Sequence, residues 1–177
     1  KYDLPREALP TQFLNAPEVW EALLVKMPMT AMLRNLGVMA KVGLLTALSV
    51  AEHIVVGRLS NAELLRKARI HPIAVLSALK IYGRGYGERS SASWTPTARV
   101  VDALDAAFYL AFGNVEPSNK RLMLALDVSG SMGGGVIAGV PGLTPRDASA
   151  VMAMVTARTE DQYALMGFAT ELMPLNI

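Results

Sequence analysis

The sequence predicts a chain of two parts, a series of α-helices followed by the beginning of an α/β sheet. Up to about residue 113, apolar residues recur at helical spacing, and Pro, Ser, Thr and Asn stand where helices begin or end. After residue 120 the pattern changes to a continuous apolar run of strand length, a glycine-rich loop and a helix with a strong start signal. We therefore predict a helical domain over residues 1–118 and an α/β domain over residues 119–177.

Start signals and prolines define the helices of the first part. Asn15 can cap the first helix, Ser60 followed by Glu63 has the spacing of a capping box, and Pro72 opens a helix in its first turn. Short connections between helices of this length are typical of a helical-repeat array, and a compact helical bundle is the alternative. The expected helices cover residues 15–27, 30–41, 44–56, 60–68, 73–82 and 96–113.

The second part is predicted to form a strand, a loop, a helix and a second strand. Residues 121–128 have the character of a central parallel strand, residues 130–142 form a glycine-rich loop, and residues 162–169 form the next strand. Thr144, Pro145 and Asp147 supply a cap, a first-turn proline and a dipole-favoured acid for a helix to about residue 159. In such sheets, ligands bind beyond the carboxyl ends of the strands.

Composition excludes several classes of function. The 177 residues are 52% hydrophobic and contain no cysteine, which removes disulfide scaffolds, cysteine-based zinc sites and thiol catalysis. No apolar stretch reaches the roughly 18 residues that span a bilayer, so we expect no membrane partner and a cytoplasmic location. Because the chain does not begin with Met, we expect it to be a piece of a longer protein.

The strongest site signal is the motif D-x-S-x-S at Asp127, Ser129 and Ser131, directly after the predicted strand. Alternate residues of a turning loop point to one side, and one carboxylate with two hydroxyls supplies the hard oxygen ligands that suit Mg²⁺ or Mn²⁺, with Mg²⁺ favoured. With one formal negative charge among the ligands, the ion would keep a net positive charge and could recruit an acidic group. The alternative is that these side chains only cap the following turn.

Positive charge favours an anionic partner for the helical part. Residues 1–120 hold 14 Lys and Arg against 10 Asp and Glu, whereas residues 121–177 hold 3 against 5. Arg66, Lys67, Arg69 and His71 form the densest positive patch, which could bind phosphate. A solvated face with cations at a helix end is the competing interpretation.

The loop over residues 82–94, YGRGYGERSSASW, interleaves arginines with aromatic residues. Arg84 and Arg89 alternate with Tyr82, Tyr86 and Trp94, a mixture that can pair with phosphates and stack on bases. The competing interpretation is a flexible helix connection. Its glycines do not follow a strand, so the loop is not a dinucleotide or P-loop fingerprint.

Several polar and aromatic residues are expected to be structural rather than functional. His53 is expected on a helix face. Asp102 and Asp105 are expected to be solvated. The sequence contains no G-x-S-x-G, no H-E-x-x-H and no lysine after a phosphate loop, so a binding protein is favoured over an enzyme. Core packing is expected of Trp20, Phe108 and Tyr109.

Five segments together resemble the Ro autoantigen family, whose TROVE module precedes a von Willebrand factor A domain. They are MPMTAMLRNLG at 27–37, KARIHP at 67–72, LDAAFY at 104–109, LALDVSGSM at 124–132 and ARTE at 157–160. The resemblance implies HEAT-like helical repeats closed into a ring, followed by a Rossmann-like A domain, with residues 1–118 and 119–177 as the adjoining pieces of each. Asp127, Ser129 and Ser131 match the metal motif of that family, whose threonine and second aspartate come from later loops.

The same resemblance implies a ribonucleoprotein component. It implies binding of small noncoding RNA, the Y RNAs, capture of misfolded RNA ends and a role in noncoding-RNA quality control. An exoribonuclease or another protein is expected as a partner through the metal site. The alternative function is a metal-dependent, adhesion-type module that binds protein without RNA. Contacts of Arg66, Lys67, Arg69, His71 and Arg84 with RNA are predicted from charge and do not follow from the resemblance.

Overall fold

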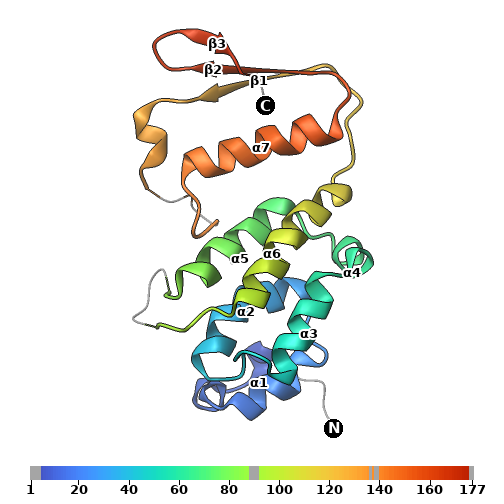
Figure 1. Ribbon diagram of the computed structural model, residues 1–177, viewed down its shortest axis with the longest axis vertical. Coiled ribbons are helices and arrows are strands. Elements are labelled where there is room, and N and C mark those ends of the chain that lie inside the picture. Colours follow the sequence, from blue (N-terminus) through green and yellow to red (C-terminus); the bar gives the residue numbers. More distant parts are fainter. Residues whose placement is uncertain (1–4, 88–91, 136, 138–139, 176–177) are drawn as a thin grey trace.

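The computed structural model describes residues 5–87, 92–135, 137 and 140–175 (Figure 1). In this part of the chain a helical half leads into a small sheet with one long helix against it, as the sequence predicts. The helical half contains η1 (Arg6–Ala8), η2 (Thr11–Asn15), α1 (Pro17–Leu24), α2 (Met29–Lys41), α3 (Val50–Leu59), α4 (Ala62–Lys67), α5 (Pro72–Arg84), α6 (Ala98–Leu110) and η3 (Ala111–Asn114). The sheet half contains β1 (Leu122–Asp127), η4 (Gly130–Gly133), α7 (Pro145–Thr159), β2 (Tyr163–Phe168) and β3 (Leu172–Pro174).

Two helix caps differ from the prediction by one residue. Asn15 lies at the end of η2, and Ala16 is the N-cap of α1 without a side-chain hydrogen bond. For α4 the cap is Asn61 rather than Ser60, because the Asn61 side chain accepts a hydrogen bond from the N–H of Leu64 at 3.0 Å. Both helices exist where the sequence places them, and only their first residues were wrong.

The helix predicted over residues 44–56 begins six residues later than expected, at Val50 in α3. Leu48 has a φ of 65°, a left-handed conformation that a right-handed helix cannot contain. Ser49 then accepts the N–H of Glu52 at 3.1 Å and caps α3. Ser49 and Glu52 have the capping-box spacing, so the sequence did contain the signal for the true start.

One core runs through the helical half and includes most of the aromatic residues expected there. Trp20 is fully buried and its indole N–H donates to the carbonyl of Leu14 at 2.8 Å. Phe108 is buried on α6, but its neighbour Tyr109 is 48% exposed, contrary to the prediction. Adjacent helical residues differ by about 100° in direction, so only one of the two can point into the core. Asp102 and Asp105 are exposed, as predicted.

The sheet has the order β1-β2-β3, with β1 parallel to β2 and β3 antiparallel to β2. Leu122 pairs with Tyr163 and Asp127 with Phe168, so the carboxyl ends of the parallel strands lie together. The crossover is α7, whose start is a capping box between Thr144 and Asp147, as predicted. The sequence prediction missed β3.

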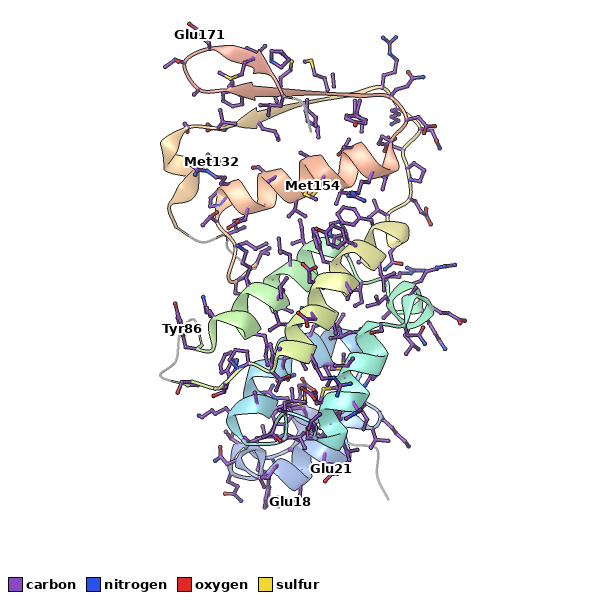
Figure 2. All side chains as sticks on the ribbon, in the orientation of Figure 1. Glu18, Glu21, Tyr86, Met132, Met154 and Glu171 are labelled. Atoms are coloured by element: carbon purple, nitrogen blue, oxygen red, sulfur yellow. The ribbon has the colours of Figure 1, made fainter. Side chains whose placement is uncertain are left out.

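The sheet half packs directly onto the helical half through α7. Val151 and Val155 of α7 belong to the same buried core as the helices, and Met154 packs against it (Figure 2). The guanidinium of Arg158 lies over the rings of Tyr109 and Phe112 at 5.6 Å and 5.5 Å. The exposed ring of Tyr109 therefore contacts the other half of the molecule. The domain boundary at residue 118 stays a prediction.

None of the helices in the described part of the chain is long and apolar enough to cross a bilayer.

Candidate metal centre and nucleic-acid interface

The candidate metal ligands come together at the carboxyl end of β1. Asp127 is the last residue of the strand, Ser129 is the N-cap of η4, and Ser131 lies within η4. The carboxylate Oδ1 of Asp127 accepts the backbone N–H of Ser129 at 2.9 Å, and the hydroxyl oxygens of Ser129 and Ser131 are 2.9 Å apart. The structure therefore places the three predicted side chains in one cluster.

The two serine hydroxyls are at hydrogen-bond distance from each other, a separation that two ligands of an octahedral cation also have. At an Mg–O distance of about 2.1 Å, neighbouring ligands of an octahedral shell lie about 3 Å apart, which matches the separation of the two hydroxyls. The hydroxyl and N–H of Ser129 hold the pKa of Asp127 below its usual value, against a smaller opposing effect of burial. The carboxylate is thus ionised at neutral pH. Among the described residues no group of three or more His, Cys, Asp or Glu could hold a metal, so the candidate combines one carboxylate with two hydroxyls.

The loop around the cluster is close to a basic side chain. Arg146, in the first turn of α7, points a guanidinium nitrogen at the carbonyl of Ser129 over 3.5 Å. A Cβ at Gly133 would lie 3.3 Å from the same nitrogen, so glycine gives the guanidinium room to approach the loop. Thr144 is the threonine nearest in sequence to Asp127, Ser129 and Ser131. Its hydroxyl is used in the capping box of α7 and, in the described part of the chain, makes no hydrogen bond to these three residues.

Three of the predicted phosphate-binding cations are exposed at the end of α4. Arg66, Lys67 and Arg69 are solvent-exposed and, in the described part of the chain, form no ion pair with an acidic side chain. Arg69 has a φ of 50°, which ends the helix and turns the chain toward α5. These three side chains are free to meet an anionic partner.

His71 has a local structural role that the sequence prediction missed. Its Nδ1 accepts the N–H of Ile73 at 3.2 Å and caps α5. Partial burial lowers the pKa of His71 below its usual value, and an accepting Nδ1 requires a ring without a proton on that nitrogen. The imidazole is therefore neutral at pH 7 and adds no charge to the patch.

Arg84 lies at the opposite end of α5 from the other predicted RNA-binding residues. It is thirteen positions from His71, which corresponds to about 20 Å along the helix. Its Nε donates to the carbonyl of Tyr86 at 2.9 Å, and its guanidinium lies 4.9 Å from the Tyr86 ring centre. Tyr86 itself projects at the edge of the molecule (Figure 2).

The other aromatic residues of this loop are structural. Tyr82 is buried, and its hydroxyl accepts the N–H of Thr97 at 3.1 Å. The indole N–H of Trp94 donates to the carbonyl of Tyr82 at 3.0 Å. Arg89 lies outside the described residues. Among the described residues, only Arg84 and Tyr86 are left from the predicted set of stacking and phosphate-pairing groups.

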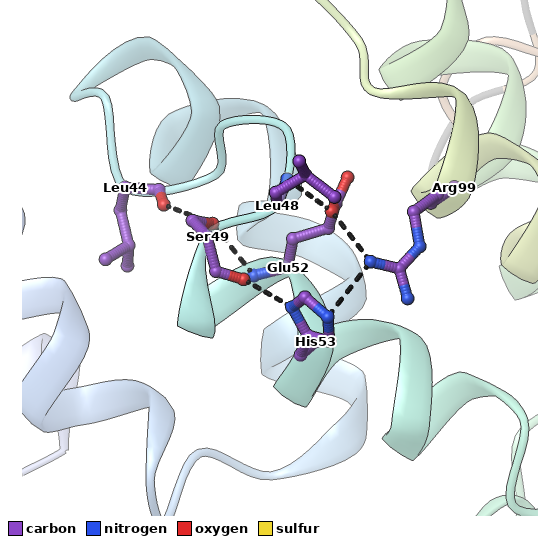
Figure 3. Close-up of polar contacts among 6 residues, drawn as sticks. All are labelled: Leu44, Leu48, Ser49, Glu52, His53 and Arg99. Carbon is purple, nitrogen blue, oxygen red and sulfur yellow. Dashed lines mark hydrogen bonds and ion pairs between the residues drawn. The ribbon is translucent and has the colours of Figure 1, made fainter.

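A buried polar cluster joins α3 to α6 (Figure 3). The carboxylate of Glu52, 1% exposed, accepts the N–H of Leu48 at 2.8 Å and pairs with Arg99 at 3.3 Å. Burial alone would raise the pKa of Glu52, but Thr97, the Leu48 amide and the charge of Arg99 together hold it below its usual value.

His53 completes this cluster on the exposed side. Its Nδ1 contacts the carbonyl of Ser49 at 2.9 Å, and its Nε2 contacts the guanidinium of Arg99 at 3.2 Å. The carbonyl can only accept and the guanidinium can only donate, so the proton of a neutral ring lies on Nδ1. His53 thus has the structural place on a helix face that the sequence predicts.

The fold and the site define a class of protein, a helical module joined to an adhesion-type domain. Its helices lead into an α/β sheet, and D-x-S-x-S stands at the end of the first strand. Family models match both parts of the chain. The TROVE domain matches residues 4–81, and the Ro60 vWA domain matches residues 121–177.

Two named proteins and one solved structure are similar in sequence to this chain over all or nearly all of its length. It is 48% identical over 178 residues to the RNA-binding protein RO60 of Deinococcus radiodurans, covering 100% of this chain and 33% of that protein. It is 44% identical over 176 residues to the RNA-binding protein RO60 of Caenorhabditis elegans, covering 99% of this chain and 27% of that protein. The crystal structure of the Deinococcus radiodurans Ro (RSR) protein matches with a TM-score of 0.91 and 48% identity, covering 99% of this chain and 36% of that chain.

The chain therefore belongs to the Ro family, and it spans about a third of the length of the first of these relatives. The predicted family and fold class are confirmed, and the helices are consistent with the HEAT-like arrangement.

Proposed function

We propose that this chain is part of an RNA-binding ribonucleoprotein component that binds small noncoding RNA of the Y type and takes part in noncoding-RNA quality control. The observation that carries the proposal is the 48% and 44% identity to two proteins named for RNA binding, across the full chain. The exposed cations Arg66, Lys67 and Arg69 support it, because such groups release counterions when they meet phosphates. The protein acts as a cytoplasmic binding component without catalysis, and it captures misfolded RNA ends.

The test is RNA binding by the complete protein as a function of salt. We expect co-purifying RNA and an affinity that falls steeply as salt rises. Replacing Arg66, Lys67 and Arg69 by Gln should lower the slope of log K against log[salt] by about 2 to 3 if all three contact phosphate. Arg34→Gln with Lys41→Gln is the matched control, because both are exposed cations on another helix. Binding that does not respond to salt would contradict the proposal.

We further propose that Asp127, Ser129 and Ser131 hold Mg²⁺, with remaining ligands from later in the complete chain. The ion would supply a Lewis-acidic centre that accepts an anionic oxygen from a partner, for example an exoribonuclease. Asp127→Asn keeps the shape of the side chain but removes its charge, and Ser131→Ala removes one hydroxyl. Mn²⁺ binding by the complete protein, followed by electron paramagnetic resonance, should weaken in both. Equal Mn²⁺ affinity in wild type and Asp127→Asn would rule the site out.

A second candidate is a metal-dependent protein-binding module that acts without RNA. The clustered hydroxyls with a single carboxylate favour it, because the bound ion would keep positive charge for a partner's carboxylate. In that case the interaction with a protein partner is lost with chelator and with Asp127→Ala, and no RNA is retained on purification. RNA retained in the presence of chelator separates the first function from the second.

A further inference from the structure

A groove of about 570 Å³ lies between α2 and α5, and its lining includes His71 but none of the exposed cations at the end of α4 and none of the candidate metal ligands. Its α2 side includes Leu33 and Val38, and its α5 side includes Ile73 and Ile81. Pro141, from the segment before α7, also lines it. The groove is of the size that binding sites usually have, and its surface is mainly aliphatic.

The charge on the groove has one sign. Arg34 and Lys41 line it from α2, both are exposed, and neither forms an ion pair within the described part of the chain. No Asp or Glu is among the described lining residues. His71, which also lines the groove, is held neutral by its cap on α5. An occupant must therefore combine apolar surface with negative charge.

The wall of the groove is preformed. The six-membered ring of Trp94 lies against Gly37, where an added Cβ would come within 2.6 Å of it. The indole N–H is fixed on the carbonyl of Tyr82 at 3.0 Å. A surface that is rigid before binding loses little conformational entropy when a partner docks.

The lining favours aliphatic side chains over nucleobases. Sites for single-stranded nucleic acid stack successive bases on several aromatic rings. Here the described lining has two rings that solvent can reach, the indole of Trp94, part of which Gly37 already covers, and the smaller imidazole of His71, which caps α5. The remaining surface, from residues such as Leu33 and Ile81, offers no stacking platform.

The spacing of the two cations matches a helix. Arg34 and Lys41 are seven residues apart, so they lie on the same side of α2 and about 10 Å apart along it. Two acidic residues seven positions apart on a partner helix are separated by the same distance along its axis, so they match Arg34 and Lys41. We propose that the groove between α2 and α5 docks an amphipathic helix of a partner protein, with its apolar face in the groove and two acidic residues on Arg34 and Lys41.

The proposal can be tested with the complete protein labelled with 5-fluorotryptophan. The ¹⁹F resonance of Trp94 is assigned by its loss in Trp94→Phe. The probes are a synthetic helical peptide with a leucine face and two Glu seven residues apart, the same peptide with Lys in place of Glu, and a 12-nucleotide oligouridine. We expect the acidic peptide to shift the Trp94 resonance and the lysine peptide and oligouridine to leave it unchanged.

Charge reversal separates docking from misfolding. Arg34→Glu with Lys41→Glu should weaken the acidic peptide about tenfold and should gain affinity for the lysine peptide, a swap that a folding defect does not produce. Arg66→Glu with Lys67→Glu should leave peptide binding unchanged. The proposal is overturned if the acidic peptide does not shift Trp94, or if oligouridine shifts it instead. It is also overturned if a soluble gadolinium chelate fails to broaden the Trp94 resonance in the free protein, because the groove is then covered by the chain itself.

Discussion

Removing the carboxylate of Glu52 should destabilise the helical half more than any exposed acidic substitution. Glu52→Ala removes a carboxylate that is 1% exposed and leaves the N–H of the exposed Leu48 and the partly exposed guanidinium of Arg99 without their acceptor. A hydrogen bond to a charged group contributes about 1.5–3 kcal/mol, and the partly exposed Arg99 adds little. We therefore expect Glu52→Ala to lower the free energy of unfolding by about 2–3 kcal/mol, and Glu52→Gln by about half as much because the amide oxygen still accepts the Leu48 amide.

The measurement is urea unfolding followed by far-UV circular dichroism. Glu63→Ala is the matched control, since Glu63 is an exposed first-turn acid of α4 and its removal should change stability by about 0.5 kcal/mol or less. Equal effects of Glu52→Ala and Glu63→Ala would refute the assigned role of the buried carboxylate.

The pH dependence gives a second test of the same residue. The pKa of Glu52 lies below its usual value of 4.5 in the folded protein, so the folded state binds the proton less readily than the unfolded chain. The stability from its charge is complete above about pH 4.5 and is lost as the pH falls through the folded-state pKa. The difference in free energy of unfolding between wild type and Glu52→Gln should therefore be constant from pH 7 to 5 and shrink below that range.

Four other substitutions have outcomes that the structure determines. Gly37→Ala should destabilise the protein by about 1 kcal/mol, because the added Cβ would meet the ring of Trp94. Gly57→Ala in α3 should instead stabilise it by up to about 1 kcal/mol, because no atom lies within 4 Å of the added group. A thermal unfolding midpoint that moves in the same direction in both variants would contradict this reasoning. Thr144→Ala should cost about 1 kcal/mol in urea unfolding, because it removes the capping box of α7, and an unchanged midpoint would contradict that. Because the pKa of His71 is lowered, its ring caps α5 fully above about pH 6.5 and less well as the pH falls. Wild type should therefore lose stability between about pH 6.5 and 5. His71→Asn supplies an acceptor that does not titrate, so the stability of this variant should not show that loss.

The β1 to α7 region was predictable because its signals are local. Thr144, Pro145 and Asp147 lie within four residues and define the start of α7 by themselves. The alternation in D-x-S-x-S likewise brings Ser129 and Ser131 together within a single turn, so no distant part of the chain is needed to form that cluster. The start of α3 also had a local signal, the Ser49 and Glu52 spacing, which the longer apolar run around it obscured.

Features that depend on contacts between distant segments were not predictable. The ring of Tyr109 contacts the guanidinium of Arg158, which lies 49 positions later in the chain. Glu52 is buried because α6 brings Arg99 and Thr97 to it across more than forty residues. The groove between α2 and α5 exists only once these helices pack side by side.

The sequence by itself determined the order of helices and strands, the family and the candidate metal cluster, because each depends on residues that are neighbours along the chain. Only the tertiary structure decided which cations are free and what lines the groove beside Arg34 and Lys41. It also placed His71 as a neutral cap rather than a positive charge. Exposure, ion pairing and the pKa of a side chain are set by atoms that folding brings close, and spacing along the sequence does not encode them.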